Sequence, residues 1–188
     1  MSSLPSEPRS RLPGDEELLL AAGRGDLGAF EHLMLRYEHA AWNAAYRFLG
    51  DPVEAEDIAQ EAFFRIYRAA ARYQPTATFR TYLYRIVTRL CIDFVEKKRP
   101  YYSSNLPDGA DQAPIPHNVV TITDRCQEVR KALDRLPPTQ RMAVVLKYYE
   151  GLGYREISDA METTVKGVER LLARGREALG RSLLTIFD

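Results

Sequence analysis

The sequence predicts an all-α fold of two small helical domains joined by a flexible, acidic, proline-containing linker, and three observations support this prediction. Apolar residues recur at helical spacing along most of the 188 residues, and no segment shows the alternation of a half-buried strand. Residues 100–123 hold four prolines and no basic side chain, which interrupts the helical pattern. Two short helical patterns near the C-terminus, separated by a few polar residues, are typical of a helix-turn-helix.

The first domain is predicted at residues 15–99, after a disordered tail at 1–14. Asp26 and Asp51 fit the N-cap position of two long helices, and Pro52 fits a first helical turn. Gly50 fits the position that ends a helix. With these signals, we expect helices at residues 15–23, 27–49, 52–72 and 79–98.

The second domain is predicted at residues 124–188, after the linker at 100–123. Its helices are expected near residues 124–136, 138–149, 154–161 and 164–184. In the last helix, Lys166, Arg170 and Arg174 recur at i, i+4 and i+8, opposite the apolar Val165, Val168 and Leu172. This pattern predicts either a recognition helix for DNA, beginning near Thr164, or a packed helical hairpin with a charged surface.

Charge is segregated along the chain although the net charge is zero. Residues 1–64 carry 5 basic and 12 acidic side chains, whereas residues 65–99 carry 9 basic and 2 acidic ones. Residues 100–124 carry no basic and 3 acidic side chains, and the remainder carries 12 basic and 9 acidic ones. Blocks of opposite sign indicate two classes of partner, one recognised by acidic and one by basic side chains.

The helix at 52–72 has an apolar stripe on one side and an acidic face on another. That face is formed by Asp57, Gln60, Glu61 and Phe64. Carboxylates around an exposed aromatic ring are typical of a docking surface for a basic protein partner. The alternative is that Phe64 packs under the first helix while the acidic residues only solvate that side.

The helix at 79–98 is basic and has aromatic residues at its edge. Arginines attract phosphates and tyrosine rings stack on unpaired bases, so this helix favours single-stranded or opened DNA. The polar loop 73–78 before it could receive an extruded base. A solvated basic face whose tyrosines close the core is the alternative. The candidate contacts are Tyr73, Gln74, Thr76, Arg80, Tyr82, Arg85, Arg89, Lys97, Lys98 and Arg99.

Four blocks in this order resemble bacterial RNA polymerase sigma factors of the extracytoplasmic function type. They are AEDIAQEAFFRIYRA, FRTYLYRIVTRLCIDFVEKKR, ALDRLPPTQRMAVVLKYYEGLGYREIS and the terminal helix. The resemblance implies that residues 15–99 bind the polymerase clamp helices through Asp57, Gln60, Glu61 and Phe64, and open the promoter's −10 element. Within that domain it places the flipped base in loop 73–78 and the guided strand along Tyr82, Arg85 and Arg89.

For the rest of the chain, the resemblance implies a linker that threads the RNA exit path of polymerase and a domain at 124–188 that reads the −35 element and contacts the flap. The expected −35 contacts are Arg155, Thr164, Lys166, Gly167, Glu169, Arg170 and Arg174. An anti-sigma protein is expected as a further partner. The family usually has glycine where Glu162 stands, an apolar residue where Thr163 stands and a basic one where Glu169 stands, so the −35 sequence preference stays open.

Two other classes of function are alternatives to a sigma factor. An enzyme is disfavoured because the three histidines form no metal-binding set and no phosphate loop or nucleophile motif occurs. A stand-alone helix-turn-helix repressor or activator is the second alternative. No cofactor or metal is expected. Neither a membrane-spanning run nor a secretory signal occurs, and Cys91 and Cys126 are isolated, so a cytoplasmic protein without membrane insertion is expected.

Overall fold

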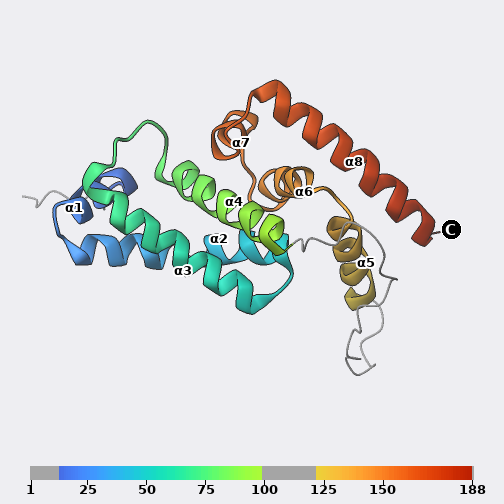
Figure 1. Ribbon diagram of the computed structural model, residues 1–188, viewed down its shortest axis with the longest axis horizontal. Coiled ribbons are helices and arrows are strands. Elements are labelled where there is room, and N and C mark those ends of the chain that lie inside the picture. The colour runs from blue at the N-terminus through green and yellow to red at the C-terminus, as the bar shows by residue number, and fades with distance from the viewer. Residues whose placement is uncertain (1–12, 99–121, 188) are drawn as a thin grey trace, which may run out of the picture.

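A computed structural model of the protein describes residues 13–98 and 122–187, and within them all regular structure is helical (Figure 1). The all-α prediction is therefore confirmed for this part of the chain. The tail at 1–12 and most of the predicted linker lie outside the described residues. The first half contains α1 (Asp15–Gly23), α2 (Leu27–Leu49), α3 (Pro52–Ala69), the 3₁₀ turn η1 (Ala70–Arg72) and α4 (Phe79–Lys98).

Local capping explains where the helices of the first half begin and end. The Asp26 carboxylate accepts a first-turn amide of α2 at 3.0 Å, and Asp51 accepts two first-turn amides of α3 at 2.8 and 3.1 Å. Between them Gly50 has a φ of 85°, a left-handed conformation that favours glycine. A Cβ at Gly50 would also lie 1.7 Å from Nη2 of Arg130, so α5 approaches this turn closely.

The second half contains α5 (Ile122–Asp134), α6 (Pro138–Val144), the π-helical turn η2 (Val145–Tyr149), α7 (Tyr154–Ala160) and α8 (Val165–Phe187). The single helix expected at 138–149 is thus α6 followed by a wider turn, which the sequence pattern did not predict. The helix-turn-helix is formed by α7 and α8. At the start of α7 the Glu156 carboxylate accepts the Gly153 amide at 2.7 Å, which fixes the entry to that helix.

The two halves pack against each other in addition to being joined through the linker (Figure 1). Helices α2, α3 and α4 form a bundle, α1 crosses one end of it, and α6 and α7 pack on α8. Helix α7 lies against α4, and η2 lies against α2. Most of the buried apolar side chains of both halves form one continuous cluster. Sequence reasoning predicted the two helical groups but not this contact, which brings the helix-turn-helix next to the basic helix α4.

Candidate nucleic-acid interface

The acidic face of α3 is exposed as predicted. Phe64 is 55% exposed, and the guanidinium of Arg68 lies 5.6 Å from the centre of its ring. Asp57 and Gln60 are exposed, and Glu61 pairs with Arg65 on the next turn at 2.7 Å. The prediction that Phe64 faces solvent is confirmed, and the alternative in which it packs under the first helix is wrong.

Exposed apolar side chains extend this face onto α2, and sequence reasoning missed them. Tyr67 is partly exposed, and its ring lies 5.0 Å from that of Phe30. Leu27 and Met34 lie three residues before and four after Phe30 on α2, and both are exposed. The missed residues follow the same helical spacing as a core stripe, so sequence alone did not distinguish them from buried ones. Together with Phe64 they provide an apolar surface beside the carboxylates.

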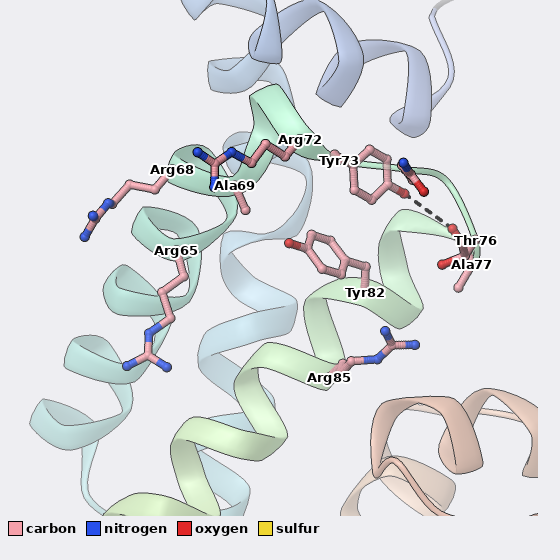
Figure 2. A pocket seen from close by; sticks show the side chains of 10 residues that line it. Arg65, Arg68, Ala69, Arg72, Tyr73, Thr76, Ala77, Tyr82 and Arg85 are labelled. Carbon is pink, nitrogen blue, oxygen red and sulfur yellow. Dashed lines mark hydrogen bonds between the residues drawn. The ribbon is translucent and has the colours of Figure 1, made fainter.

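A pocket of about 550 Å³ opens where the end of α3, η1, the loop 73–78 and the first turns of α4 meet (Figure 2). Its lining residues are Arg65, Arg68, Ala69, Arg72, Tyr73, Gln74, Thr76, Ala77, Tyr82 and Arg85. Arginines from three segments of the chain surround it, and none of the lining residues is acidic. A concave surface of one charge sign concentrates ligands of the opposite sign. The pocket therefore suits an anionic ligand with a flat, apolar part.

Two tyrosines provide the aromatic surface of the pocket. The ring centres of Tyr73 and Tyr82 lie 5.2 Å apart, with the rings tilted by 42°. The Tyr73 hydroxyl donates a hydrogen bond to the Ala77 carbonyl at 3.4 Å, which ties the ring to its own loop (Figure 2). Burial raises the pKa of both hydroxyls, and for Tyr73 the nearby Glu16 carboxylate adds to the effect. Both phenols therefore stay neutral at physiological pH, as a stacking surface requires.

The loop 73–78 is held at its far end by a residue from α1. Oε1 of Glu16 accepts the backbone amide of Phe79 at 2.9 Å and so caps the start of α4. The Thr78 hydroxyl accepts the amide of Thr81 at 3.3 Å in the same turn. Glu16 stands 63 residues from its partner, so no local sequence signal could have identified it. The position of the loop therefore depends on α1.

The structure brings some of the predicted −10 contacts together and separates others. Tyr73, Gln74, Thr76, Tyr82 and Arg85 line the pocket. Nε of Arg85 also donates to the main-chain carbonyl of Asp159 in α7 at 3.0 Å.

Arg80, grouped with these residues by sequence, does not line the pocket. Its guanidinium donates to the carbonyl of Glu150, and it is stacked over Tyr84 at 5.5 Å. Arg89 and Lys97 are exposed further along α4, whereas the side chain of Lys98 and all of Arg99 lie outside the described residues.

Three arginines of the pocket were missed by sequence reasoning. Arg65, Arg68 and Arg72 come from α3 and η1, and they follow the spacing i, i+3 and i+7. The spacing indicates that the three arginines share one side of a helix. The sequence does not show that this side faces the same pocket as Tyr82.

In the helix-turn-helix, α8 is oriented by its buried side and presents its charged side to solvent. Val168 and Leu172 are buried, whereas Lys166, Glu169, Arg170 and Arg174 are exposed. Arg155 at the start of α7 is also exposed. The Thr164 hydroxyl caps α8 by accepting the Gly167 amide at 3.0 Å. Val165, the first residue of α8, is 37% exposed, unlike the two other apolar residues of that side.

The backbone of the turn between α7 and α8 explains why glycine is the usual residue at position 162 in the family that the sequence resembles. Glu162 has a φ of 50°, the left-handed conformation, and no other non-glycine residue in the described ranges has a positive φ. This conformation costs a residue with a side chain about 1–2 kcal/mol relative to the right-handed one. The next residue, Thr163, donates its amide to the Ser158 carbonyl at 2.9 Å and closes the turn. Position 162 therefore favours glycine, and Glu162 introduces strain.

Two other kinds of feature are absent from the described ranges. None of their helices is long and apolar enough to cross a membrane. Nor do 13–98 and 122–187 contain a group of three or more His, Cys, Asp or Glu side chains placed to hold a metal ion. His32 and His39 are exposed on α2, while His117 lies outside the described residues.

Comparison with known proteins gives matches in both halves. The sigma-70 region 2 family pattern matches residues 33–101, and the sigma-70 region 4 pattern matches residues 126–179. The chain is 34% identical over 175 residues to the ECF RNA polymerase sigma factor SigW of Bacillus subtilis (strain 168), covering 85% of this chain and 91% of SigW. It is 31% identical over 180 residues to the RNA polymerase sigma-H factor of Pseudomonas aeruginosa, covering 90% and 93%.

Two solved structures share the fold. The structure of CnrH in complex with the cytosolic domain of CnrY matches with a TM-score of 0.70 and 23% identity, over 91% of this chain and 97% of that chain. The sigma factor RpoE from Bartonella quintana, solved with the anti-sigma factor NepR, matches with a TM-score of 0.64 and 17% identity, over 82% and 96%. At these identities the likeness supports the arrangement of the helices.

Proposed function

The chain belongs to the extracytoplasmic function (ECF) family of RNA polymerase sigma factors, and from this premise we propose which part of it performs each step of transcription initiation. The protein binds core RNA polymerase and directs it to the promoters of a particular regulon, where transcription starts. It acts by binding, without catalytic chemistry of its own. Residues 15–99 form the polymerase- and −10-binding domain, 100–123 the linker, and 124–188 the −35-binding domain.

The pocket beside α4 is the observation that carries this proposal. Taking a base out of the duplex stack costs a few kcal/mol. Stacking of that base on a tyrosine ring returns about 1–3 kcal/mol. Tyr73 and Tyr82 offer neutral rings, and the surrounding arginines attract the phosphates on either side of the base. The pocket thereby favours the opened −10 element over the closed duplex.

The acidic face of α3 is proposed to bind the clamp helices of the large polymerase subunit. Asp57 and Glu61 supply charge that a basic partner would pair with, and Phe64 supplies an exposed aromatic anchor. The apolar side chains of α2 beside it widen the surface that such a partner could bury.

The exposed side of α8 is proposed to enter the major groove of the −35 element. Lys166, Arg170 and Arg174 follow one edge of the helix and can contact phosphates and base edges. Glu169 on the same side could accept from a cytosine amino group. The domain that carries α8 also contacts the polymerase flap, and the acidic linker passes through the RNA exit path.

A stand-alone repressor or activator is the second candidate, and binding to DNA without polymerase distinguishes the two. A repressor should hold duplex DNA tightly by itself, whereas a sigma factor should do so only after it has bound core polymerase. The basic pocket favours the sigma factor, because a duplex-binding repressor has no use for a site that receives an unstacked base.

The test begins with the promoter. Sequencing the 5′ ends of transcripts from cells that overproduce the protein yields a shared motif. A duplex with that motif and 2-aminopurine in the −10 element is then mixed with core polymerase and the protein. Fluorescence should rise only with both proteins present, because the base leaves the stack. Failure to co-elute with core polymerase, or an assembly that leaves the −10 bases paired, would overturn the proposal.

An anti-sigma factor and a cytoplasmic location are also proposed. Both solved structures that share the fold are complexes with a second protein. CnrH is bound to the cytosolic domain of CnrY, and RpoE from Bartonella quintana is bound to the anti-sigma factor NepR. The acidic face and the apolar surface beside it are the candidate contact for such a partner. A purified anti-sigma protein that competes with core polymerase for this chain would support the assignment.

A further inference from the structure

Glu150, the residue after η2, inserts its side chain into the first half of the molecule. Its carboxylate pairs with Nη1 of Arg47 at 2.5 Å and accepts the Tyr84 hydroxyl at 2.6 Å. Its main-chain carbonyl accepts a hydrogen bond from Arg80. The Glu150 side chain is only 7% exposed, so these contacts are largely shielded from water. One residue of the second half thus binds groups from two helices of the first.

The groups that receive Glu150 are held in place by the first half itself. Tyr84 is buried in the core of that half, and the Arg80 guanidinium stacks over its ring at 5.5 Å. Arg47 projects from the end of α2 toward the same point. Burial, together with the hydrogen bond to Glu150, raises the pKa of Tyr84, so its hydroxyl stays protonated and can donate to an anion.

These groups resemble an anion-binding site more than a matched ion pair. Two guanidinium groups and a phenol converge, whereas Glu150 supplies one carboxylate, and Arg80 receives only a main-chain carbonyl. A phosphate carries more acceptor oxygens than a carboxylate and is a preferred ligand of arginine. The Glu150 carboxylate therefore satisfies the site only in part.

We propose that Arg47, Arg80 and Tyr84 form a binding site for a backbone phosphate of single-stranded DNA, which Glu150 occupies while the two halves are packed together. The proposal rests on the function proposed above. Glu150 is then an internal competitor of the promoter strand, and the strand must displace η2 to reach the site. We call Arg47, Arg80 and Tyr84 the anion site.

The position of the anion site relative to the pocket supports a DNA strand as its ligand. Arg80 and Arg85 lie five residues apart on α4, and Arg85 lines the pocket. Both arginines donate to carbonyls of the second half, Arg80 to Glu150 and Arg85 to Asp159. The same movement of η2 and α7 would release both, so a strand held in the pocket could extend across α4 to the anion site.

The test uses the full chain without polymerase and a fluorescein-labelled oligonucleotide of twelve thymidines. Glu150→Gln keeps the shape of the side chain but removes its charge, so it should bind the oligonucleotide about fivefold more tightly or better, because the DNA-competent state becomes more populated. Asp159→Asn is the matched control. It removes one charge from the same interface, but its contact with Arg85 uses the main-chain carbonyl, so affinity should stay close to wild type.

A second substitution assigns the gain to the anion site. Adding Arg47→Ala to Glu150→Gln should return the affinity to the wild-type value or below it, because Arg47 is a phosphate contact in this proposal. The proposal is overturned if Glu150→Gln binds no better than Asp159→Asn, or if its gain survives Arg47→Ala. Circular dichroism establishes that each variant is folded.

Hydrogen exchange provides a measurement that needs no change at Glu150. In the wild-type protein, saturating oligonucleotide should speed amide exchange in residues 145–160, since DNA would displace η2 and α7. Unchanged exchange with DNA bound would contradict the proposal. Wild-type transcription from the mapped promoter tests the proposed function separately, because it does not depend on where the anion site lies.

Discussion

The two proposed DNA-binding surfaces are built in different ways. On α8, Lys166, Arg170 and Arg174 project from a single helix into solvent. The pocket is assembled from α3, η1, a loop and α4, and its Arg85 also donates to α7. A surface made by one helix is complete as soon as that helix is packed. A composite surface depends on several segments, and here one of its arginines is also bound by the other half.

The largest effect is expected from a loss of polymerase binding. It would disable both DNA-binding surfaces equally, because neither would then reach a promoter. Asp57→Lys together with Glu61→Lys should weaken core polymerase binding about 100-fold or more, because the charges would repel a basic partner. Both sites are exposed or half-exposed, and Glu61 loses only a surface ion pair, so helicity should not change. Analytical size exclusion with core polymerase measures the loss. Glu96→Lys on α4 is the control, and equal binding by the double variant and the control would exclude the acidic face.

Impairing the pocket alone should separate the surfaces. Tyr73→Leu removes one stacking ring, and we expect about tenfold less −10 opening by the holoenzyme, given the usual contribution of stacking. Fluorescence of 2-aminopurine in the −10 element reports the opening. Binding of the same holoenzyme to a duplex that carries only the −35 element should not change. Tyr148→Leu, at an exposed tyrosine of the second half, is the matched control. Normal opening by Tyr73→Leu would count against the pocket.

A change in α8 alone should weaken −35 binding and leave −10 opening intact, and the effect should be smaller than that of the pocket variant. Arg170→Ala should weaken holoenzyme binding to the −35 element about fivefold and lower its salt dependence if the contact is to phosphate. Opening of a −10 element supplied as a pre-melted fork should stay normal. Arg176→Ala, on another side of α8, is the control. Wild-type promoter activity of Arg170→Ala would remove that arginine from the interface.

Relieving the turn before α8 should change stability without changing either surface. Glu162→Gly removes the strain of a φ of 50° and should raise the free energy of unfolding by about 1 kcal/mol or less, because the added freedom of glycine in the unfolded chain offsets part of the gain. Thermal unfolding followed by circular dichroism would show a melting temperature a few degrees higher. Glu162→Gln removes the charge but keeps the strain. An equal rise for Glu162→Gln would mean that charge, and not backbone conformation, is responsible.

The sequence was sufficient wherever structure is set by neighbouring residues. Asp26, Asp51 and Gly50 fix helix ends through contacts within a few residues, and the helices begin and end close to the predicted positions. The charged edge of α8 follows from helical periodicity. Such features need no knowledge of how helices pack.

The rest depended on contacts between distant residues. Glu16 caps a helix 63 residues away, and Arg47 meets Glu150 across 103 residues. No local pattern marks either pair. Arg80 was predicted as a promoter contact, but no local pattern shows that packing directs its guanidinium to the main-chain carbonyl of Glu150. Tyr84 was not singled out because one tyrosine in a basic helix does not reveal that it is buried.

The hydrogen bonds between the halves have an evolutionary consequence. Arg80, Arg85 and Arg141 each donate to a main-chain carbonyl of the other half, at Glu150, Asp159 and Phe48 respectively. Every residue type supplies such an acceptor. Relatives could therefore diverge at the exposed position 159 and keep its contact as long as Arg85 is retained, whereas position 48 is also constrained by the burial of the Phe48 side chain in the core. Selection for the packed arrangement should be visible mainly on the donor side of the interface.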